Sequence, residues 1–160
     1  MALTQSFVLG PMAGFASYPL ITVPEGASQT FKAGDLLVAS SGLAVVGGAD
    51  PTAGTIIGIA TCDGSNTTAG TLIEVIPALP GLIFSGQIQN AAATATLVYA
   101  THMFAEFGIN VTSNKWWIDT DETTHKDVII VSFQDAVGTL NGIVNFMFKP
   151  LGTIYGTAIT

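Results

Sequence analysis

The sequence contains no arginine and little charge of either sign. Its 160 residues include only four lysines against eleven acidic residues, which gives a formal net charge of −7 at pH 7. Nucleic-acid binding requires a basic surface that contacts phosphates. The four lysines are far apart in the sequence: Lys32, Lys115, Lys126 and Lys149. We therefore predict no nucleic-acid partner, and the shortage of cations equally disfavours an anionic membrane.

Cysteine and uninterrupted hydrophobic runs are also scarce. Cys62 is the single cysteine, so no intrachain disulfide can form, as expected for a protein made in a reducing cytosol. The first 24 residues carry no charge, but Pro11, Pro19 and Pro24 interrupt any helix there. The start also lacks the basic residues of a signal peptide. The sequence therefore predicts no membrane-spanning helix.

What the sequence does contain indicates an all-β protein. Clusters of Gly, Pro, Asn, Asp and Ser separate short runs of Val, Ile, Leu, Thr and Phe. Strands are predicted at Tyr18–Val23, Leu36–Ala39, Leu43–Val46, Thr55–Thr61, Thr71–Ile76, Leu82–Ile88, Phe104–Asn110, Lys115–Asp119, Val128–Phe133 and Ile143–Phe148. Many short strands at this spacing favour a small barrel or sandwich.

Two segments depart from the strand pattern. Residues 1–17 have no periodicity and mix apolar residues with Gly and Pro, so we predict an extended N-terminal arm before a single β domain over 18–160. The alanine-rich stretch 91–103 is the one place that favours a short helix. The run Val128–Phe133 is apolar except for Ser132, which predicts a strand buried on both faces.

Cys62 could pair with His102 or His125 as a nucleophile and its base. Neither histidine lies in a recognisable catalytic motif, and a lone cysteine in a β protein is more simply a small buried thiol. No other acid–base pair is identifiable in the sequence. We therefore predict that the protein is not an enzyme and uses no cofactor.

The densest acidic segment, which includes one histidine, could bind a hard cation. It consists of Asp119, Asp121, Glu122, His125 and Asp127. Its start is similar to a calcium-binding loop, but Thr124 stands where such a loop needs glycine, and Ile130 stands where it needs a bidentate glutamate. We therefore predict a solvated loop and no metal site.

Trp116 and Trp117 are adjacent, so their rings should point to opposite faces of a strand. We expect one ring in the core and the other exposed, as an interface anchor or a sugar-binding platform. No second exposed aromatic residue is identifiable nearby, which favours the interface.

The order of the glycine-marked segments resembles the head-decoration, or cement, proteins of tailed bacteriophages. The segments are Phe31–Leu37, Gly54–Ala60, Gly70–Val75 and Gly81–Phe84. The later segments Trp116–Asp119, Val128–Phe133, Asp135–Gly142 and Ile143–Phe148 are similar to the second half of larger cement proteins. The resemblance covers roughly residues 18–149 and implies a β-tulip or jelly-roll-like domain.

The same resemblance implies a structural role on the outside of an icosahedral phage head. Such proteins bind the major capsid protein, usually as homotrimers, and tie neighbouring capsid subunits together after the shell expands. The N-terminal arm would contact the capsid through Phe7, Val8, Leu9, Pro11, Met12, Phe15 and Tyr18, which match such an arm in position and character only. An uncharged apolar arm would be an aggregation hazard unless it orders on a partner.

Two other functions remain open. One is a carbohydrate-binding β module on a virion, which would use Trp116 or Trp117 with the acidic segment. The other is a different virion part, such as a head-fibre base, a tail-tube subunit or the coat of a small virus.

Overall fold

The computed structural model describes residues 8–10, 18–48, 50–90, 94–112, 115–122 and 124–155. It confirms the predicted all-β fold with one short α-helix. The strands are β1 (Val8–Gly10), β2 (Ile21–Pro24), β3 (Leu36–Ser40), β4 (Leu43–Val46), β5 (Ile56–Ala60), β6 (Leu72–Pro77), β7 (Ile83–Gln89), β8 (Glu106–Thr112), β9 (Lys115–Asp119), β10 (Val128–Phe133) and β11 (Ile143–Phe148). The helix α1 spans Tyr99–His102, and a 3₁₀ turn, η1, spans Pro150–Gly152.

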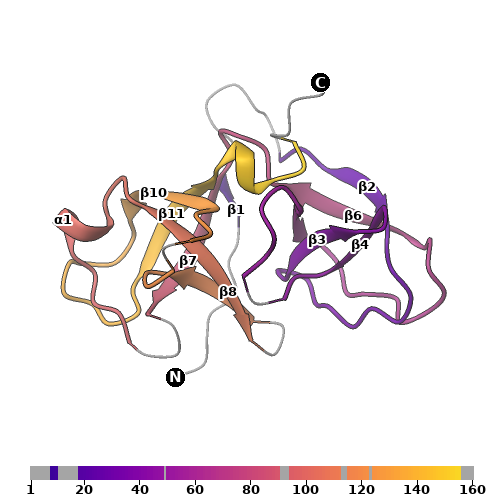
Figure 1. The fold of residues 1–160 in the computed structure, drawn as a ribbon, viewed down its shortest axis with the longest axis horizontal. Coiled ribbons are helices and arrows are strands. Elements are labelled where there is room, and N and C mark those ends of the chain that lie inside the picture. Colours follow the sequence, from indigo (N-terminus) through magenta and orange to yellow (C-terminus); the bar gives the residue numbers. More distant parts are fainter. Residues whose placement is uncertain are drawn as a thin grey trace.

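The second half of the chain forms a closed five-stranded barrel. Its strands follow the order β7, β11, β10, β8 and β9, and β9 pairs back onto β7 (Figure 1). All neighbours are antiparallel except β9 and β7, which close the barrel through a short parallel pairing of Ile118 with Ile88. β1 adds to the other half of β7, where Val8 lies opposite Phe84.

The first half of the chain forms a rolled antiparallel sheet. Its order is β2, β6, β5, β3 and β4, and it lies beside the barrel (Figure 1). A single bridge between Glu25 and Ala44 brings the end of β2 against β4. The Gly26 amide donates to the Ala44 carbonyl oxygen at 2.8 Å, which holds the two outer strands of the sheet together.

Strand β5 belongs to both regions because it is buried on both faces. Ile56 and Ile59 pack into the barrel core, whereas Ile57 and Ala60 pack into the core of the rolled sheet. The strand changes register near Gly58, where a Cβ atom would lie only 2.0 Å from the Ile76 carbonyl oxygen. A bulge built on glycine therefore allows one strand to serve two cores.

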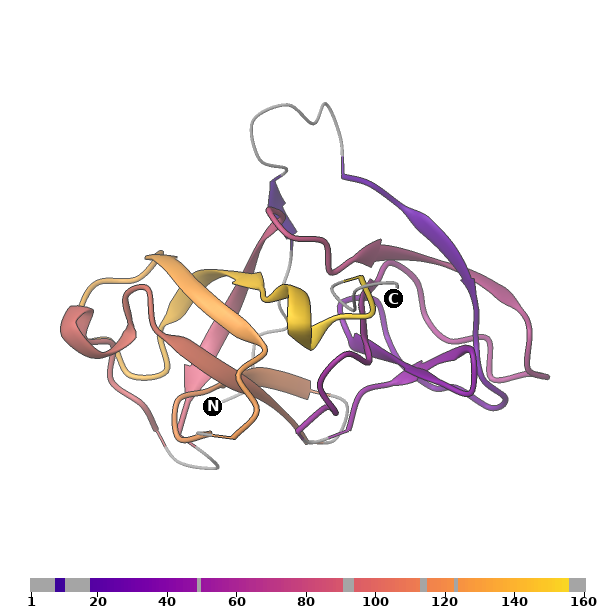
Figure 2. The same ribbon diagram turned by 45° about the horizontal axis from the view of Figure 1, so that its top comes forward.

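Two further contacts connect the regions. The Trp116 indole on β9 donates its Nε1 hydrogen to the Gly34 carbonyl oxygen in the rolled sheet, at 3.0 Å. After β11, the turn η1 leads the chain between the two regions (Figure 2). There Thr153 pairs with Ile56, and the Ile154 amide donates to the Ile56 carbonyl oxygen at 3.1 Å.

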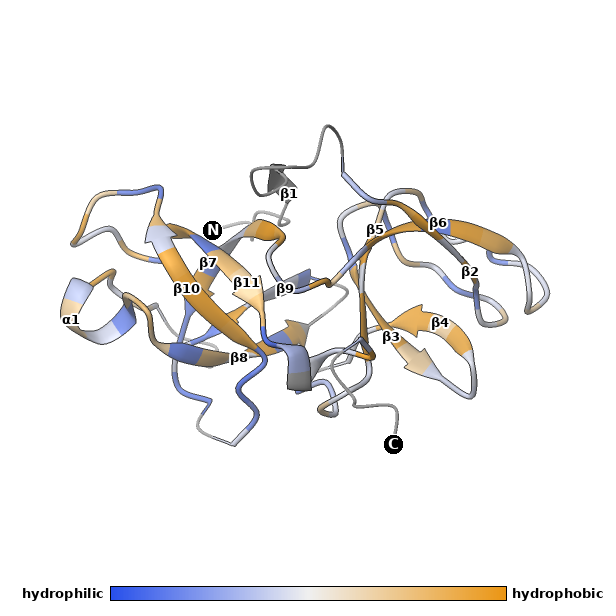
Figure 3. Cartoon of the chain, turned by 90° about the horizontal axis from the view of Figure 1, so that it is seen from above, coloured by the Kyte–Doolittle hydropathy of each residue, from blue (hydrophilic) through white to orange (hydrophobic). Residues whose placement is uncertain are grey.

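Hydrophobic residues concentrate on the strands of both regions (Figure 3). One expectation about them is wrong: Val128–Phe133 is not buried on both faces. In β10, Val128 and Ile130 are buried, whereas Ile129 and Val131 are only partly covered. The physical reason is that β10 forms part of a barrel wall, with one face toward the core and the other toward the outside.

Candidate functional site

The structure places Cys62 and the two histidines in different surroundings. Cys62 is a partly buried free thiol that packs against the core of the rolled sheet. His102 lies in α1 of the barrel, where its ring is 5.6 Å from that of Phe107. His125 lies in the loop between β9 and β10, and its Nδ1 is 4.0 Å from a Glu122 oxygen. Among the described residues, no hydrogen bond joins the thiol to either imidazole, so the geometry offers no nucleophile–base pair.

His102 instead holds the turn around α1. It is buried, and its Nδ1 accepts the Val98 amide hydrogen at 3.0 Å. Burial lowers the pKa of this imidazole, which favours the neutral form. The cationic form would need a proton on Nδ1 and would lose the Val98 bond. His102 is therefore a structural residue that fixes the backbone before α1.

Carboxylates of the acidic segment, in the β9–β10 loop, accept hydrogen bonds from other groups of the protein. Asp119 accepts from Asn110 Nδ2 at 3.1 Å and from the Asp121 amide at 3.0 Å. Glu122 accepts from the amides of Thr124 and His125, and these bonds lower its pKa. Across the described residues, no group of three or more His, Cys, Asp or Glu side chains could hold a metal ion.

The expectation that this whole segment faces solvent is wrong for two of its acids. Asp119 and Asp127 are 4% and 1% exposed. Asp127 Oδ2 has no hydrogen-bond partner, and burial raises the pKa of this carboxyl from 3.8 to about 6, against the opposing charges of His125 and Lys149. Asp127 lies under η1, since a Cβ at Gly152 would be 2.8 Å from its Oδ1. Local sequence pattern does not indicate this burial, because the turn that covers Asp127 comes from a distant segment.

The expectation that one tryptophan ring is exposed is also wrong. Trp116 fills the barrel core, edge-on to Phe146 with ring centroids 5.8 Å apart. Trp117 points to the opposite face but is only 4% exposed, and its Nε1 has no hydrogen-bond partner. Neither ring is therefore available as a platform for a sugar.

The predicted capsid-contact arm falls mainly outside the described residues, which do not include Phe7, Pro11, Met12 and Phe15. Val8 and Leu9 belong to β1, whose backbone adds to β7 of the same chain. Tyr18 is half-buried just before β2. The role of the arm in binding therefore remains a prediction.

Much of the charge in the described part of the chain is already paired or buried. Lys32 pairs with Asp63, and Lys149 pairs with Glu106, each at 2.7 Å. Four of the eleven acids are buried: Glu25, Asp35, Asp119 and Asp127. The unpaired charge on this surface is therefore smaller than the composition suggests.

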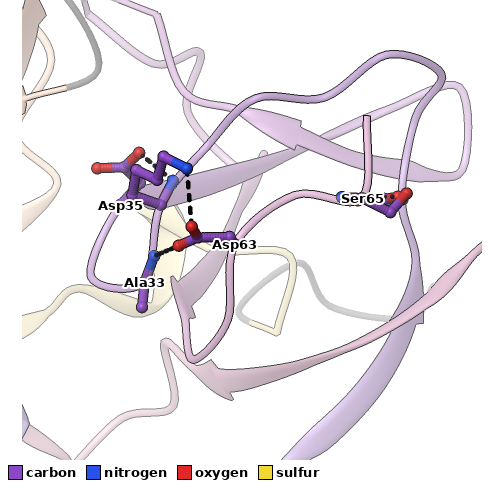
Figure 4. A network of polar contacts seen from close by, with 6 residues as sticks. Ala33, Asp35, Asp63 and Ser65 are labelled. Atoms are coloured by element: carbon purple, nitrogen blue, oxygen red, sulfur yellow. Dashed lines mark hydrogen bonds and ion pairs between the residues drawn. The ribbon is translucent and has the colours of Figure 1, made fainter. Parts of the chain in front are cut away.

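A polar network around the start of β3 shows how acids are used in the rolled sheet (Figure 4). The Lys32 amide donates to Asp35 Oδ2 at 2.7 Å, and the Ala33 amide donates to Asp63 Oδ1 at 3.1 Å. The buried Glu25 carboxylate accepts the Ser65 amide at 3.1 and 3.2 Å. These acids fix loops and leave no free carboxylate pair for catalysis.

Five of the exposed large apolar side chains form a group that was not predicted from the sequence. They lie at the α1 end of the barrel: Val98, Tyr99, Phe104, Val137 and Leu140. Leu20, just before β2, and Leu72, at the start of β6, are exposed at opposite ends of the β2–β6 pairing. A usable signal was present, because neither 91–105 nor 136–148 contains a charged residue. Phe104 was expected inside a strand, but it occupies the turn between α1 and β8.

Within the described residues, no helix is long and apolar enough to cross a membrane. Comparison with protein-family models, with curated proteins and with solved structures found no match to this chain. The function is therefore argued from the surfaces of the molecule and from the sequence pattern.

Proposed function

We propose that this protein is a structural component of a phage particle. It binds the outer surface of an icosahedral head and ties neighbouring major-capsid subunits together, as a homotrimer. In this proposal it binds the expanded shell in preference to its precursor. By linkage, it then stabilises the expanded state to which it binds more tightly.

The observation that carries the proposal is the group of exposed apolar side chains at the α1 end of the barrel, which includes Tyr99 and Phe104. The rolled sheet adds two separate exposed leucines, Leu20 just before β2 and Leu72 at the start of β6. The helix α1 and the β2–β6 pair lie toward opposite ends of the molecule (Figure 1). A group of exposed apolar side chains indicates a binding surface, and a protein that ties subunits together needs contacts at more than one place.

The location of the resembling segments supports the same proposal. Those containing β3, β5 and β6 come together in the rolled sheet, and the Gly81–Phe84 segment leads into β7. In the sequence, the arm of residues 1–17 is followed three residues later by β2, which pairs with β6. In this proposal the arm and the exposed Leu72 of β6 both contact the shell.

The proposal is tested by mixing the purified protein with expanded and with unexpanded heads of the phage that encodes it. We expect co-sedimentation with the expanded heads and much weaker retention on the unexpanded ones. Equal binding to both, or binding to neither, would overturn the proposal.

Two variants locate the contact. Deletion of residues 2–17 should abolish retention and leave the β fold intact by circular dichroism, since all described strands except β1 remain. Leu72→Ser should weaken retention, because Leu72 is 67% exposed at the start of β6. If the deletion variant is folded and binds normally, the arm has no part in binding.

The carbohydrate-binding alternative is not favoured by any contact in the described structure, since both tryptophan rings are buried. A glycan array with the wild type and the Trp117→Ala variant separates the two functions. Specific glycan binding that the variant loses would favour the alternative.

A further inference from the structure

The barrel carries an apolar patch at the end that holds α1. We call it the barrel-end patch and define it by its five exposed side chains: Val98, Tyr99, Phe104, Val137 and Leu140. Among the described residues, it contains five of the seven large hydrophobic side chains that are exposed. It lies at the end of the molecule farthest from the rolled sheet (Figure 1). Single exposed apolar residues are ordinary, but a group from two distant segments indicates a binding surface.

Backbone hydrogen bonds hold these two segments side by side. The Leu97 amide donates to the Thr139 carbonyl oxygen at 3.0 Å, and the Gly138 amide donates to the Leu97 carbonyl oxygen at 2.9 Å. The Tyr99 ring stacks on Phe133, with centroids 5.0 Å apart and planes 4° apart. The patch is therefore a built platform and not a pair of independent loops.

Phe104 has a backbone conformation that is unfavourable for a residue with a bulky side chain. It follows the C-cap of α1 with φ of 57°, in the left-handed region where glycine is strongly preferred. Its amide donates to the Ile130 carbonyl oxygen at 2.9 Å, which fixes this geometry. The bulky side chain makes the position strained, yet the residue is 70% exposed. Strain of this kind collects at binding sites, where a local rule is broken for function.

The charge distribution indicates what covers this ring. The chain carries a net charge of −7, so two copies repel each other wherever unpaired acids meet. The segments of the patch contain no charged residue. Of the two acids that border them in sequence, Glu106 pairs with Lys149, whereas Asp135 accepts the Ile143 amide at 2.8 Å and keeps its charge. The barrel-end patch thus brings no charged side chain of its own against a second copy, and in the described structure Asp135 is the one bordering acid without a cationic partner.

We propose that the barrel-end patch is the surface through which copies of this chain associate, patch against patch around a shared rotation axis. Phe104 and Tyr99 are the central contacts, since exposed aromatic residues dominate the energetics of most interfaces. Closed symmetric association uses the same residues on every copy. The inference adds to the proposed function the contact between sister subunits, and its test requires no shell.

The test measures the mass of the purified chain by sedimentation equilibrium, from low to high micromolar concentration. The wild type should form a defined oligomer. Phe104→Gly should lower the association constant by roughly 30-fold or more, as expected for the loss of an aromatic hot spot. The same variant should raise the melting temperature of the monomer, because glycine adopts this φ without strain. Lower association with unimpaired folding is a result that simple misfolding cannot produce.

Leu72→Ser is the matched control, because Leu72 is 67% exposed on the opposite end of the molecule. It should leave self-association unchanged. The inference is overturned if the wild type is monomeric throughout, if Phe104→Gly associates like the wild type, or if Leu72→Ser dissociates the oligomer equally. Shell binding is scored separately: a Phe104→Gly chain that self-associates normally but loses the shell would assign the patch to the capsid instead.

Discussion

The core of the barrel and the core of the rolled sheet differ in their types of hydrophobic residue. The barrel core contains five aromatic residues: Phe84, Phe107, Trp116, Phe146 and Phe148. The rings of Phe84, Phe146 and Phe148 contact one another, with no two centroids more than 5.8 Å apart. The core of the rolled sheet contains one aromatic residue, Phe31, among aliphatic side chains. A closed ring of five strands encloses a narrow interior that interlocking rings can fill, so the barrel has a substantial core of its own. The rolled sheet gains part of its burial from the barrel through β5.

The two regions also differ in how they bury acids. In the rolled sheet, Glu25 and Asp35 accept backbone amide hydrogens from neighbouring loops. In the barrel, the buried Asp119 also accepts hydrogen bonds, but Asp127 is buried with one oxygen unpartnered. Buried carboxylates that accept hydrogen bonds stabilise a fold, whereas an unpartnered one favours its protonated form. Asp127 should therefore make a contribution to the stability of the barrel that falls as the pH rises.

The largest effect is expected from a substitution in β5, the strand that contributes to the cores of both regions. Gly58→Ala places a Cβ atom 2.0 Å from the Ile76 carbonyl oxygen in the middle of β5. We expect a loss of roughly 3 kcal/mol or more in the free energy of unfolding, because neither backbone can move away easily. Denaturant unfolding, followed by tryptophan fluorescence and by circular dichroism, should show both signals shifting together.

Gly42→Ala is the control for the glycine substitution itself. Gly42 has a φ of 80°, but a Cβ atom added to it would meet no heavy atom within 4 Å. Its replacement by alanine should lower the free energy of unfolding by about 1 kcal/mol, which is the strain of a non-glycine residue at positive φ. If Gly58→Ala is equally mild, or if it moves one spectroscopic signal alone, the regions are not joined through β5 as described.

The next prediction concerns the hydrogen bond between the regions. Trp116→Phe removes the donor to the Gly34 carbonyl oxygen and should cost about 2 kcal/mol. Trp117→Phe removes an indole N–H that has no partner, so we expect a clearly smaller loss. Chemical denaturation of both variants measures the difference. Equal losses would mean that the Trp116 bond does not contribute to holding the regions together.

A pH prediction follows from the buried Asp127 of the barrel. Since its pKa is raised to about 6, the proton binds more tightly in the folded state than in the unfolded one. This contribution to stability is present below pH about 4 and is lost as the pH rises towards 6. Asp127→Asn cannot ionise, so it should gain up to about 2 kcal/mol relative to wild type over that range. Thermal melts of both proteins from pH 4 to pH 8, at intervals of about one unit, check this; a constant difference would contradict it.

The smallest effect is expected in the rolled sheet, at the exposed pair of Lys32 and Asp63. The hydrogen bond from Lys32 lowers the pKa of Asp63, so this contribution is present above the usual aspartate pKa and is lost as the pH falls. Asp63→Asn should thus slightly destabilise the protein at neutral pH, with a sign opposite to that of Asp127→Asn. The change should be near the limit of measurement, because both side chains are exposed. A stabilising effect of Asp63→Asn would contradict the contrast between the regions.

Strand positions could be predicted from the sequence because each depends on local alternation and on nearby turn residues. Leu43–Val46, Lys115–Asp119 and Ile143–Phe148 have the predicted bounds, and Asn141 adopts a positive φ in the predicted turn. The helix expected within 91–103 has only four residues, since β-branched residues interrupt the alanine-rich stretch. Local pattern decided these features, so no knowledge of distant contacts was needed.

The candidate surfaces could not be predicted in the same way, because exposure depends on what another segment covers. One of the two adjacent tryptophans was expected at the surface, but both are buried, and Asp127 was also expected at the surface and is buried. Phe104 was expected in a strand and is exposed in a turn. The sequence by itself determined the all-β class, the scarcity of charge and the uncharged N-terminal segment, since these follow from composition and short-range pattern. Only the tertiary structure decided that the strands divide into a barrel and a rolled sheet that share β5. The physical reason is that strand pairing and burial are set by contacts between residues far apart in the chain.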